Sequence, residues 1–183
     1  MGLKDYSYFL PGSADSVKEY NNLKSIETNH FNIALCYNVV NPKASPEGTC
    51  IVSLTTTYTS DCWSRNDPTD YVRTKEKVAA GMIDWFEKKT GITIRPYIEE
   101  IEIATPWTFC HYASVPEGAA YGYELRDWDS MMPRMMMMRE EYPIPGLKFV
   151  GAWSIRGDGF NSAIFSGDTI AKLTLGEMRE EGI

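Results

Sequence analysis

The chain has 183 residues, of which 43% are hydrophobic and 23% charged, so it can bury a normal hydrophobic core. Its 18 Lys and Arg against 25 Asp and Glu give a net charge of −7, which repels the phosphate backbone and argues against a nucleic-acid partner. No apolar run reaches the length of a membrane span, and the first residues lack the apolar core of a secretory signal. We therefore expect a cytoplasmic, folded protein.

The cysteines and histidines of the sequence indicate neither a metal site nor a nucleophilic triad. The four cysteines are Cys36, Cys50, Cys62 and Cys110. They are irregularly spaced without a C-x-x-C pair, which is typical of reduced, packed thiols. The only histidines, His30 and His111, stand in no supporting motif, so we predict no metal and assign no catalytic residue.

The first sixty residues are expected to be mainly extended. Residues 31–40 and 49–58 are rich in Val, Ile, Thr and aromatic side chains, and a segment with two prolines and a glycine separates them. This pattern predicts an antiparallel hairpin. A short helix is expected between Ser13 and Leu23.

A long helix is predicted from Asp67 to about Lys89. Asp67 and Pro68 form a typical helix start, and Gly91 a typical stop. Apolar residues recur at three- and four-residue steps and are expected to pack into the core: Tyr71, Val72, Val78, Met82, Trp85 and Phe86. A strand at Ile101–Ala104 and a short helix over Pro106–Tyr112 should follow.

Residues 115–124 contain mainly small residues, whose backbone can approach a ligand closely. Six methionines then follow within residues 131–138. Such a tract is suited to an irregular apolar ligand or partner, but methionine is also an ordinary core residue. The sequence leaves both interpretations open.

The final forty residues predict a strand, a glycine-containing loop and a helix, at Leu147–Trp153, Ser154–Gly159 and Phe160–Glu180. This order directs backbone amides and the positive end of a helix dipole at an anionic or electron-rich group. Small residues at 163, 167 and 171 give the helix a narrow face, against which another element can pack closely.

Two stretches of this region, residues 143–153 (PIPGLKFVGAW) and 157–167 (GDGFNSAIFSG), carry a resemblance to a known family. They resemble the C-terminal flavin-contacting segment of phytoene desaturase-like enzymes, the FAD-dependent oxidoreductases that include carotenoid desaturases and isomerases and retinol saturases. Two further blocks match upstream in the same order, residues 44–48 and residues 104–109 with 116–122. The resemblance covers roughly residues 29–180.

The resemblance implies which residues contact the flavin of FAD. They are Gly151, Asp158, Gly159, Asn161, Ser162 and Ala163. Asp158 is expected to bond a ribityl hydroxyl, because a carboxylate beside a reduced flavin ring would be repelled. Arg156 departs from the family pattern, which usually has proline there.

The G-x-G-x-x-G motif with which these enzymes hold the ADP half of FAD does not occur in this sequence. The resemblance therefore implies the C-terminal part of a larger flavoenzyme without its nucleotide-binding half. We expect an α+β fold: an antiparallel substrate-domain sheet with flanking helices over residues 1–142, and a strand-loop-helix belonging to a Rossmann-type FAD domain over residues 143–183.

Three functions remain open at this stage. The first is a fragment or subunit of an FAD-dependent oxidoreductase that acts on C=C or C–C bonds of an apolar, isoprenoid-like substrate and needs an N-terminal Rossmann partner. The second is a non-catalytic module that binds an apolar ligand. In either case four aromatic residues are the candidate ligand contacts, unless they are simply core: Trp107, Phe109, Tyr112 and Tyr121. The third is a self-associating homodimer, which would cover the open edge of the strand at 147–153.

Overall fold

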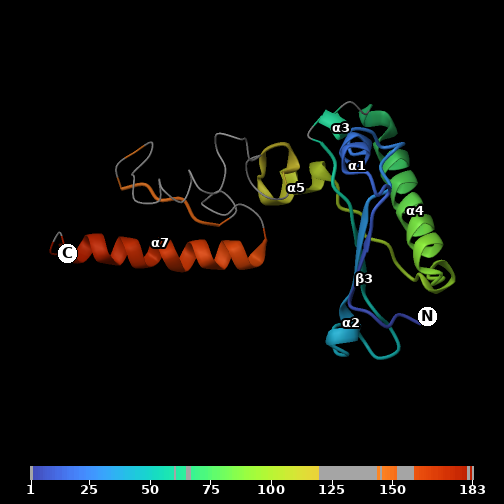
Figure 1. The fold of residues 1–183 in the computed structure, drawn as a ribbon, viewed down its shortest axis with the longest axis horizontal. Coiled ribbons are helices and arrows are strands. Elements are labelled where there is room, and N and C mark those ends of the chain that lie inside the picture. The colour runs from blue at the N-terminus through green and yellow to red at the C-terminus, as the bar shows by residue number, and fades with distance from the viewer. Residues whose placement is uncertain are drawn as a thin grey trace. The chain divides into compact units, whose positions relative to one another are not determined.

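The computed structural model describes residues 2–59, 61–64, 67–119, 144, 146–151, 159–180 and 182. The chain divides into two compact units, residues 1–105 and 106–183 (Figure 1). The functional division expected at residue 142 stays a prediction, because residues 142 and 143 lie outside the described residues.

The first unit is a three-stranded sheet with helices. Its elements are β1 (Ser7–Leu10), α1 (Ser16–Asn22), β2 (Asn32–Cys36), α2 (Tyr37–Val40), β3 (Val52–Thr55), α3 (Asp61–Ser64) and α4 (Tyr71–Thr90). The strand order is β1-β2-β3, and both pairs are antiparallel. The α+β class and the antiparallel sheet expected from the sequence are thus confirmed.

The predicted hairpin is confirmed in its centre, with shorter strands than expected. Ala34 of β2 lies opposite Leu54 of β3. The connection is folded by Asn38, whose Oδ1 accepts the Ile51 amide at 2.9 Å and whose Nδ2 donates to the Ser45 hydroxyl at 2.8 Å. These bonds turn the chain into α2 where the sequence predicted a continued strand.

The long helix forms as the sequence predicted. The Asp67 carboxylate accepts the Thr69 amide at 2.8 Å, a single 3-10 turn at Pro68–Asp70 follows, and α4 begins at Tyr71. The helix ends at Gly91, whose φ of 72° is left-handed and whose amide donates to the Glu87 carbonyl at 2.9 Å. Glycine is the residue that reaches this conformation without a steric penalty.

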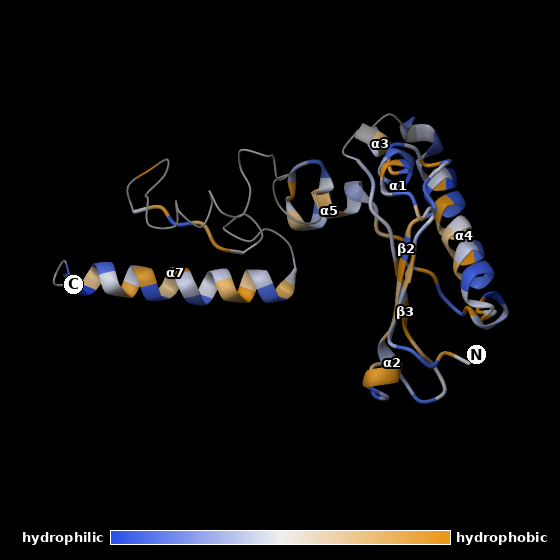
Figure 2. Cartoon of the chain, viewed as in Figure 1, coloured by the Kyte–Doolittle hydropathy of each residue, from blue (hydrophilic) through white to orange (hydrophobic). Residues whose placement is uncertain are grey.

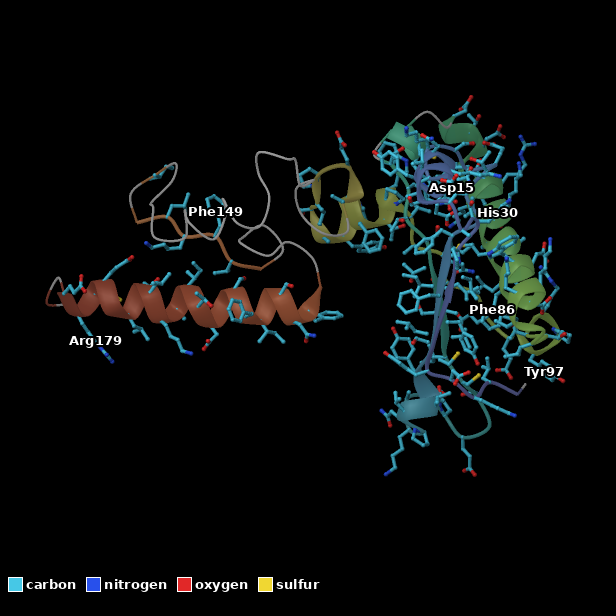
Figure 3. All side chains as sticks on the ribbon, in the orientation of Figure 1. Asp15, His30, Phe86, Tyr97, Phe149 and Arg179 are labelled. Carbon is cyan, nitrogen blue, oxygen red and sulfur yellow. The ribbon has the colours of Figure 1, made fainter. Side chains whose placement is uncertain are left out.

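The core of this unit lies between α4 and one face of the sheet, where Phe86 is placed (Figure 3). It is formed by Ala34, Ile83, Phe86 and Ile94. Tyr8 of β1 packs edge-on against Phe86, with 5.6 Å between the ring centroids. Of the predicted apolar stripe, Phe86 is fully buried, whereas Val72 is 56% exposed and faces away from this core.

The second unit contains α5 (Pro106–Ala113) and α7 (Phe160–Glu180), both close to their predicted bounds. A 3-10 turn at Pro116–Gly118 follows α5. Among the described residues, no helix combines the length and the apolarity that crossing a bilayer requires.

Two predicted strands do not form. Residues 101–104 belong to no strand, and Ile101 is 52% exposed. Residues 147–150 likewise form no strand and Gly151 begins a turn, while residues 152 and 153 lie outside the described residues. A strand depends on hydrogen bonds from a neighbouring strand, and neither apolar segment has one in the described part of the chain.

Candidate functional site

Residues 147–151 lie alongside α7, in the region that resembles a flavin-contacting segment (Figure 1). The Gly151 amide donates to Ser166 Oγ at 2.7 Å, and Lys148 Nζ lies 3.0 Å from the Glu177 carboxylate. Ser166 is fully buried, and its hydroxyl in turn donates to the Ala163 carbonyl at 3.1 Å. Ser166 therefore fastens Gly151 to the second turn of α7.

Two glycines mark the ends of the connection between this segment and the helix. Gly151 has φ 79° and Gly159 has φ 86°, both in the left-handed region. A Cβ built at either position would meet no atom of the described residues within 4 Å. The backbone conformation thus favours glycine at both positions.

Three amides at the N-terminus of α7 have no acceptor in the described part of the chain. The first helical hydrogen bond runs from the Ala163 amide to the Gly159 carbonyl at 3.0 Å. Within the described ranges, no oxygen accepts the amides of Phe160, Asn161 or Ser162, and the first turn carries no acidic residue. A helix N-terminus carries a partial positive charge, which favours an electron-rich group.

The structure places most of the expected flavin-contact residues in one continuous arrangement. Gly151 ends the segment 147–151 that Ser166 holds, Gly159 directly precedes α7, and Asn161, Ser162 and Ala163 lie in the first turn of this helix. Asp158 lies outside the described residues. Ser166 was not among the predicted site residues. A polar residue between the small and apolar positions of the predicted helix face was the feature of the sequence that could have indicated it.

The expected substrate-contact residues that the structure describes lie exposed on α5. Trp107, Phe109 and Tyr112 all lie on α5 and are 55%, 44% and 83% exposed, so none of them is core within the described residues. Phe109 and Tyr112 are three residues apart and share one side of the helix, whereas Trp107 does not. Tyr121 and the methionines at 131–138 lie outside the described residues.

The structure also brings together the two parts of one sequence block, residues 104–109 and 116–122. The turn at Pro116–Gly118 packs on the first residue of α5: a Cβ built at Gly118 would lie 2.2 Å from the Pro106 carbonyl oxygen. Ser114 and Glu117 adopt φ values of 52° and 54°, which L-residues rarely do. Strained backbone of this kind persists only where the surroundings enforce it, and it recurs near functional sites.

The sheet of the first unit has one face that α4 does not cover. The register places six side chains on this face: Ser7, Phe9, Ile33, Leu35, Ser53 and Thr55. Phe9 is 67% exposed. This face combines apolar and hydroxyl side chains.

A wide hollow of about 550 Å³ lies elsewhere in the unit, lined by Lys4, Gly91 and Tyr97 among others, and it contains none of the expected site residues.

The perturbed titrating groups of the first unit have structural causes. Burial raises the pKa of the Tyr58 hydroxyl to about 12, and burial also raises the pKa of the Cys36 thiol. Both groups lie in or beside the sheet. In the described part of the chain, no three His, Cys, Asp or Glu side chains gather as a metal site would require.

No family model, no curated protein and no solved structure matches this chain. A function must therefore be argued from the residues and the geometry given above.

Proposed function

We propose that this chain is the C-terminal part of an FAD-dependent oxidoreductase of the phytoene desaturase-like type, in which it supplies one end of the flavin site. The observation that carries the proposal is the hydrogen bond from the Gly151 amide to Ser166 Oγ, which holds residue 151 against the second turn of α7. The G-x-G-x-x-G motif is absent from this sequence, so the ADP half of FAD must be bound by another chain or another region.

The residues present fit the flavin end of FAD. Bound FAD would supply the ring that accepts a hydride and carries negative charge when reduced. The amides of Phe160, Asn161 and Ser162 would stabilise that charge by about 1 kcal/mol, as a helix N-terminus typically does for an anionic group. The lack of a side chain at Gly151 and Gly159 would allow the ring to approach the backbone.

The substrate we propose is apolar and isoprenoid-like, and the reaction forms, reduces or isomerises a C=C bond. The exposed aromatic side chains of α5, Trp107, Phe109 and Tyr112, support an apolar substrate. Hydride transfer depends on placing substrate and flavin together more than on a titrating side chain. This reaction type is therefore compatible with a chain that has only two histidines.

The test is reconstitution with a nucleotide-binding half. The full chain is mixed with the separately produced G-x-G-x-x-G half of a phytoene desaturase-like enzyme and excess FAD, and gel filtration then removes free flavin. We expect flavin absorbance between about 350 and 500 nm to co-elute with the complex, and to be lost from either protein alone.

A matched pair of variants makes this test specific to the helix terminus. Gly159→Val introduces a side chain at the end of α7, whereas Gly48→Val introduces the same strain in the first unit, since Gly48 has φ 85° and equally open surroundings. Gly159→Val should lose the retained flavin and Gly48→Val should keep it. Equal retention by both variants, or no retention by the native chain, would contradict the proposal.

A second candidate is a non-catalytic module for an apolar ligand, which the same three exposed aromatics of α5 favour. A long isoprenoid that binds the native chain must raise its melting temperature. The second candidate would replace the first if Trp107→Ala and Tyr112→Ala abolish that shift while reconstitution yields no flavin.

A further inference from the structure

The helix α7 has two apolar sides, and the described residues cover one of them. Ser166 and Ile170 are buried on the side that carries residues 147–151. The other side is a stripe at three- and four-residue steps along the whole helix, formed by Phe160, Ile164, Gly167, Ala171, Leu175 and Met178. Figure 2 shows hydrophobic residues recurring along α7, and Figure 3 shows Arg179 directed away from the segment that carries Phe149.

The large side chains of this α7 stripe are strongly exposed. Phe160 is 91% exposed, Ile164 72% and Leu175 54%. Soluble chains rarely leave a continuous apolar surface of this length in water. The helix has 21 residues and is therefore about 30 Å long, which gives the stripe the length of about three heptads.

The size pattern of the α7 stripe is self-complementary. Large side chains lie at both ends and the two small residues, Gly167 and Ala171, lie on either side of the centre, close to residue 169. An antiparallel second α7 centred there would place Phe160 opposite Met178 and Gly167 opposite Ala171. The two helices could then approach closely in the middle, because interaxial distance follows the size of the contacting side chains.

The charges beside the α7 stripe are complementary in the same arrangement. Asp168 and Lys172 flank the stripe on one side and are bonded to each other at 2.7 Å within the helix. Centring the antiparallel pair at residue 170, one residue from the centre of the stripe, brings Asp168 of each helix beside Lys172 of the other. Two further favourable charge contacts would form across the pair.

Gly167 supports a close neighbour at the centre. Glycine in a helix interior is unfavourable compared with alanine, and a Cβ built at Gly167 meets no atom within 4 Å. The described residues therefore do not require glycine at this position. A second helix at short distance would be accommodated by it.

We propose that α7 pairs in antiparallel orientation with α7 of a second copy of this chain, through the α7 stripe, to form a two-fold symmetric dimer. This proposal does not rest on the proposed function. The amides at the N-terminus of α7 point along the helix axis and would stay available at the two ends of the helix pair.

The first test is the molar mass of the full chain in solution, by light scattering after gel filtration at tens of micromolar. We expect twice the 20.7 kDa of one chain. Ala171→Glu places two carboxylates at the centre of the pair and should give a monomer, whereas Thr169→Glu adds the same charge on the opposite side of the helix and should leave the dimer. Circular dichroism checks that both variants remain folded. A monomeric native chain, or a dimer that Ala171→Glu leaves unchanged, would overturn the proposal.

A pair of smaller substitutions tests whether the two helices approach closely at the centre of the α7 stripe. Gly167→Ala and Gly176→Ala both favour the helix, but only Gly167 lies in the α7 stripe. We expect Gly167→Ala to weaken the dimer severalfold and Gly176→Ala to leave its dissociation constant unchanged. Equal effects of the two substitutions would contradict a close contact at Gly167.

Two charge variants test the antiparallel orientation. Asp168→Lys and Lys172→Asp each create like charges across an antiparallel pair, so each homodimer should be weaker than the native dimer. A mixture of the two variants restores opposite charges across the pair and should form the heterodimer preferentially. In a parallel pair Asp168 and Lys172 of the two helices would lie on opposite flanks of the contact, so these charges would not meet across the pair and neither variant would weaken its homodimer. Homodimers as strong as the native dimer, or a mixture without preference for the heterodimer, would overturn the antiparallel arrangement.

Discussion

Phe86 is the side chain on which the packing of the first unit depends most. It is fully buried between α4 and the sheet, against Tyr8. Phe86→Ala should lower the free energy of unfolding by about 3–5 kcal/mol, because it removes apolar contacts and leaves a cavity. Phe9→Ala, on the uncovered face of the sheet, should change it by less than about 1 kcal/mol. Urea denaturation followed by tryptophan fluorescence measures both.

In the second unit Ser166 stabilises the packing of residue 151 on α7 through hydrogen bonds. Ser166→Ala removes the acceptor of the Gly151 amide and should cost about 1–3 kcal/mol where that amide stays out of water. Thr169→Ala removes only a hydroxyl that bonds the Phe165 carbonyl within α7 and should cost clearly less. Hydrogen exchange at the Gly151 amide reports the difference, and equal protection in both variants would contradict this role of Ser166.

Glu87 should make the stability of the α4 C-terminus depend on pH. The amides of Arg95 and Ile94 donate to Glu87 Oε1 at 2.8 and 2.7 Å and lower the pKa of this carboxyl below its usual 4.5. A lowered pKa in the folded state means that the stabilisation is present above pH 4.5 and disappears as pH falls through the folded value.

The variant Glu87→Gln should therefore be less stable than the native chain at pH 7. The difference should shrink as the pH falls below 4.5, as the native carboxyl becomes protonated. Glu76→Gln, at an exposed position of the same helix, is the control. Melting temperatures measured from pH 7 to pH 3 test this prediction. A difference between Glu87→Gln and the native chain that grows at low pH would contradict it.

At the scale of the element, one glycine ends α4 and another lies in its interior. Substituting alanine for each of them should change the stability of the chain in opposite directions. Gly91→Ala forces an L-residue into the left-handed conformation at φ 72° and should cost about 1 kcal/mol. Gly81→Ala, in the helix interior with open space around it, should stabilise the chain by about 0.5–1 kcal/mol. Thermal unfolding of the two variants gives the signs directly, and the same sign for both would contradict the assigned helix end.

The longer helices were predicted well from the sequence because their signals are local, whereas the one-turn helices α2 and α3 were not predicted. Asp67, Pro68 and Gly91 specify the ends of α4 within a few residues of where they act. Strands were predicted less well, since a strand depends on a partner distant in the sequence. The short strand β1 was missed, and the apolar residues 101–104 and 147–150 form no strand without a neighbour. The segment at 147–150 has the composition of a central strand, as expected if its neighbours belong to a nucleotide-binding half.

At the scale of the whole molecule, the sequence predicted candidate site residues, but it did not predict the contacts that hold them in place. Gly159 and the first turn of α7 were expected from the strand-loop-helix pattern. The role of Ser166 and the contact of Gly118 with Pro106 depend on packing that no local pattern specifies. The exposure of Trp107 and Tyr112 likewise follows from the tertiary structure and could not be inferred from their apolar character.

The central claim is that this chain completes a flavin site that a nucleotide-binding half begins. The most direct measurement is the FAD dissociation constant of that half, by quenching of flavin fluorescence, with and without a saturating amount of this chain. A contribution of about 1.4 kcal/mol from the helix terminus and the fastened segment corresponds to about tenfold tighter binding, and we expect at least that gain. An unchanged dissociation constant, with the two proteins shown to associate, would contradict the account.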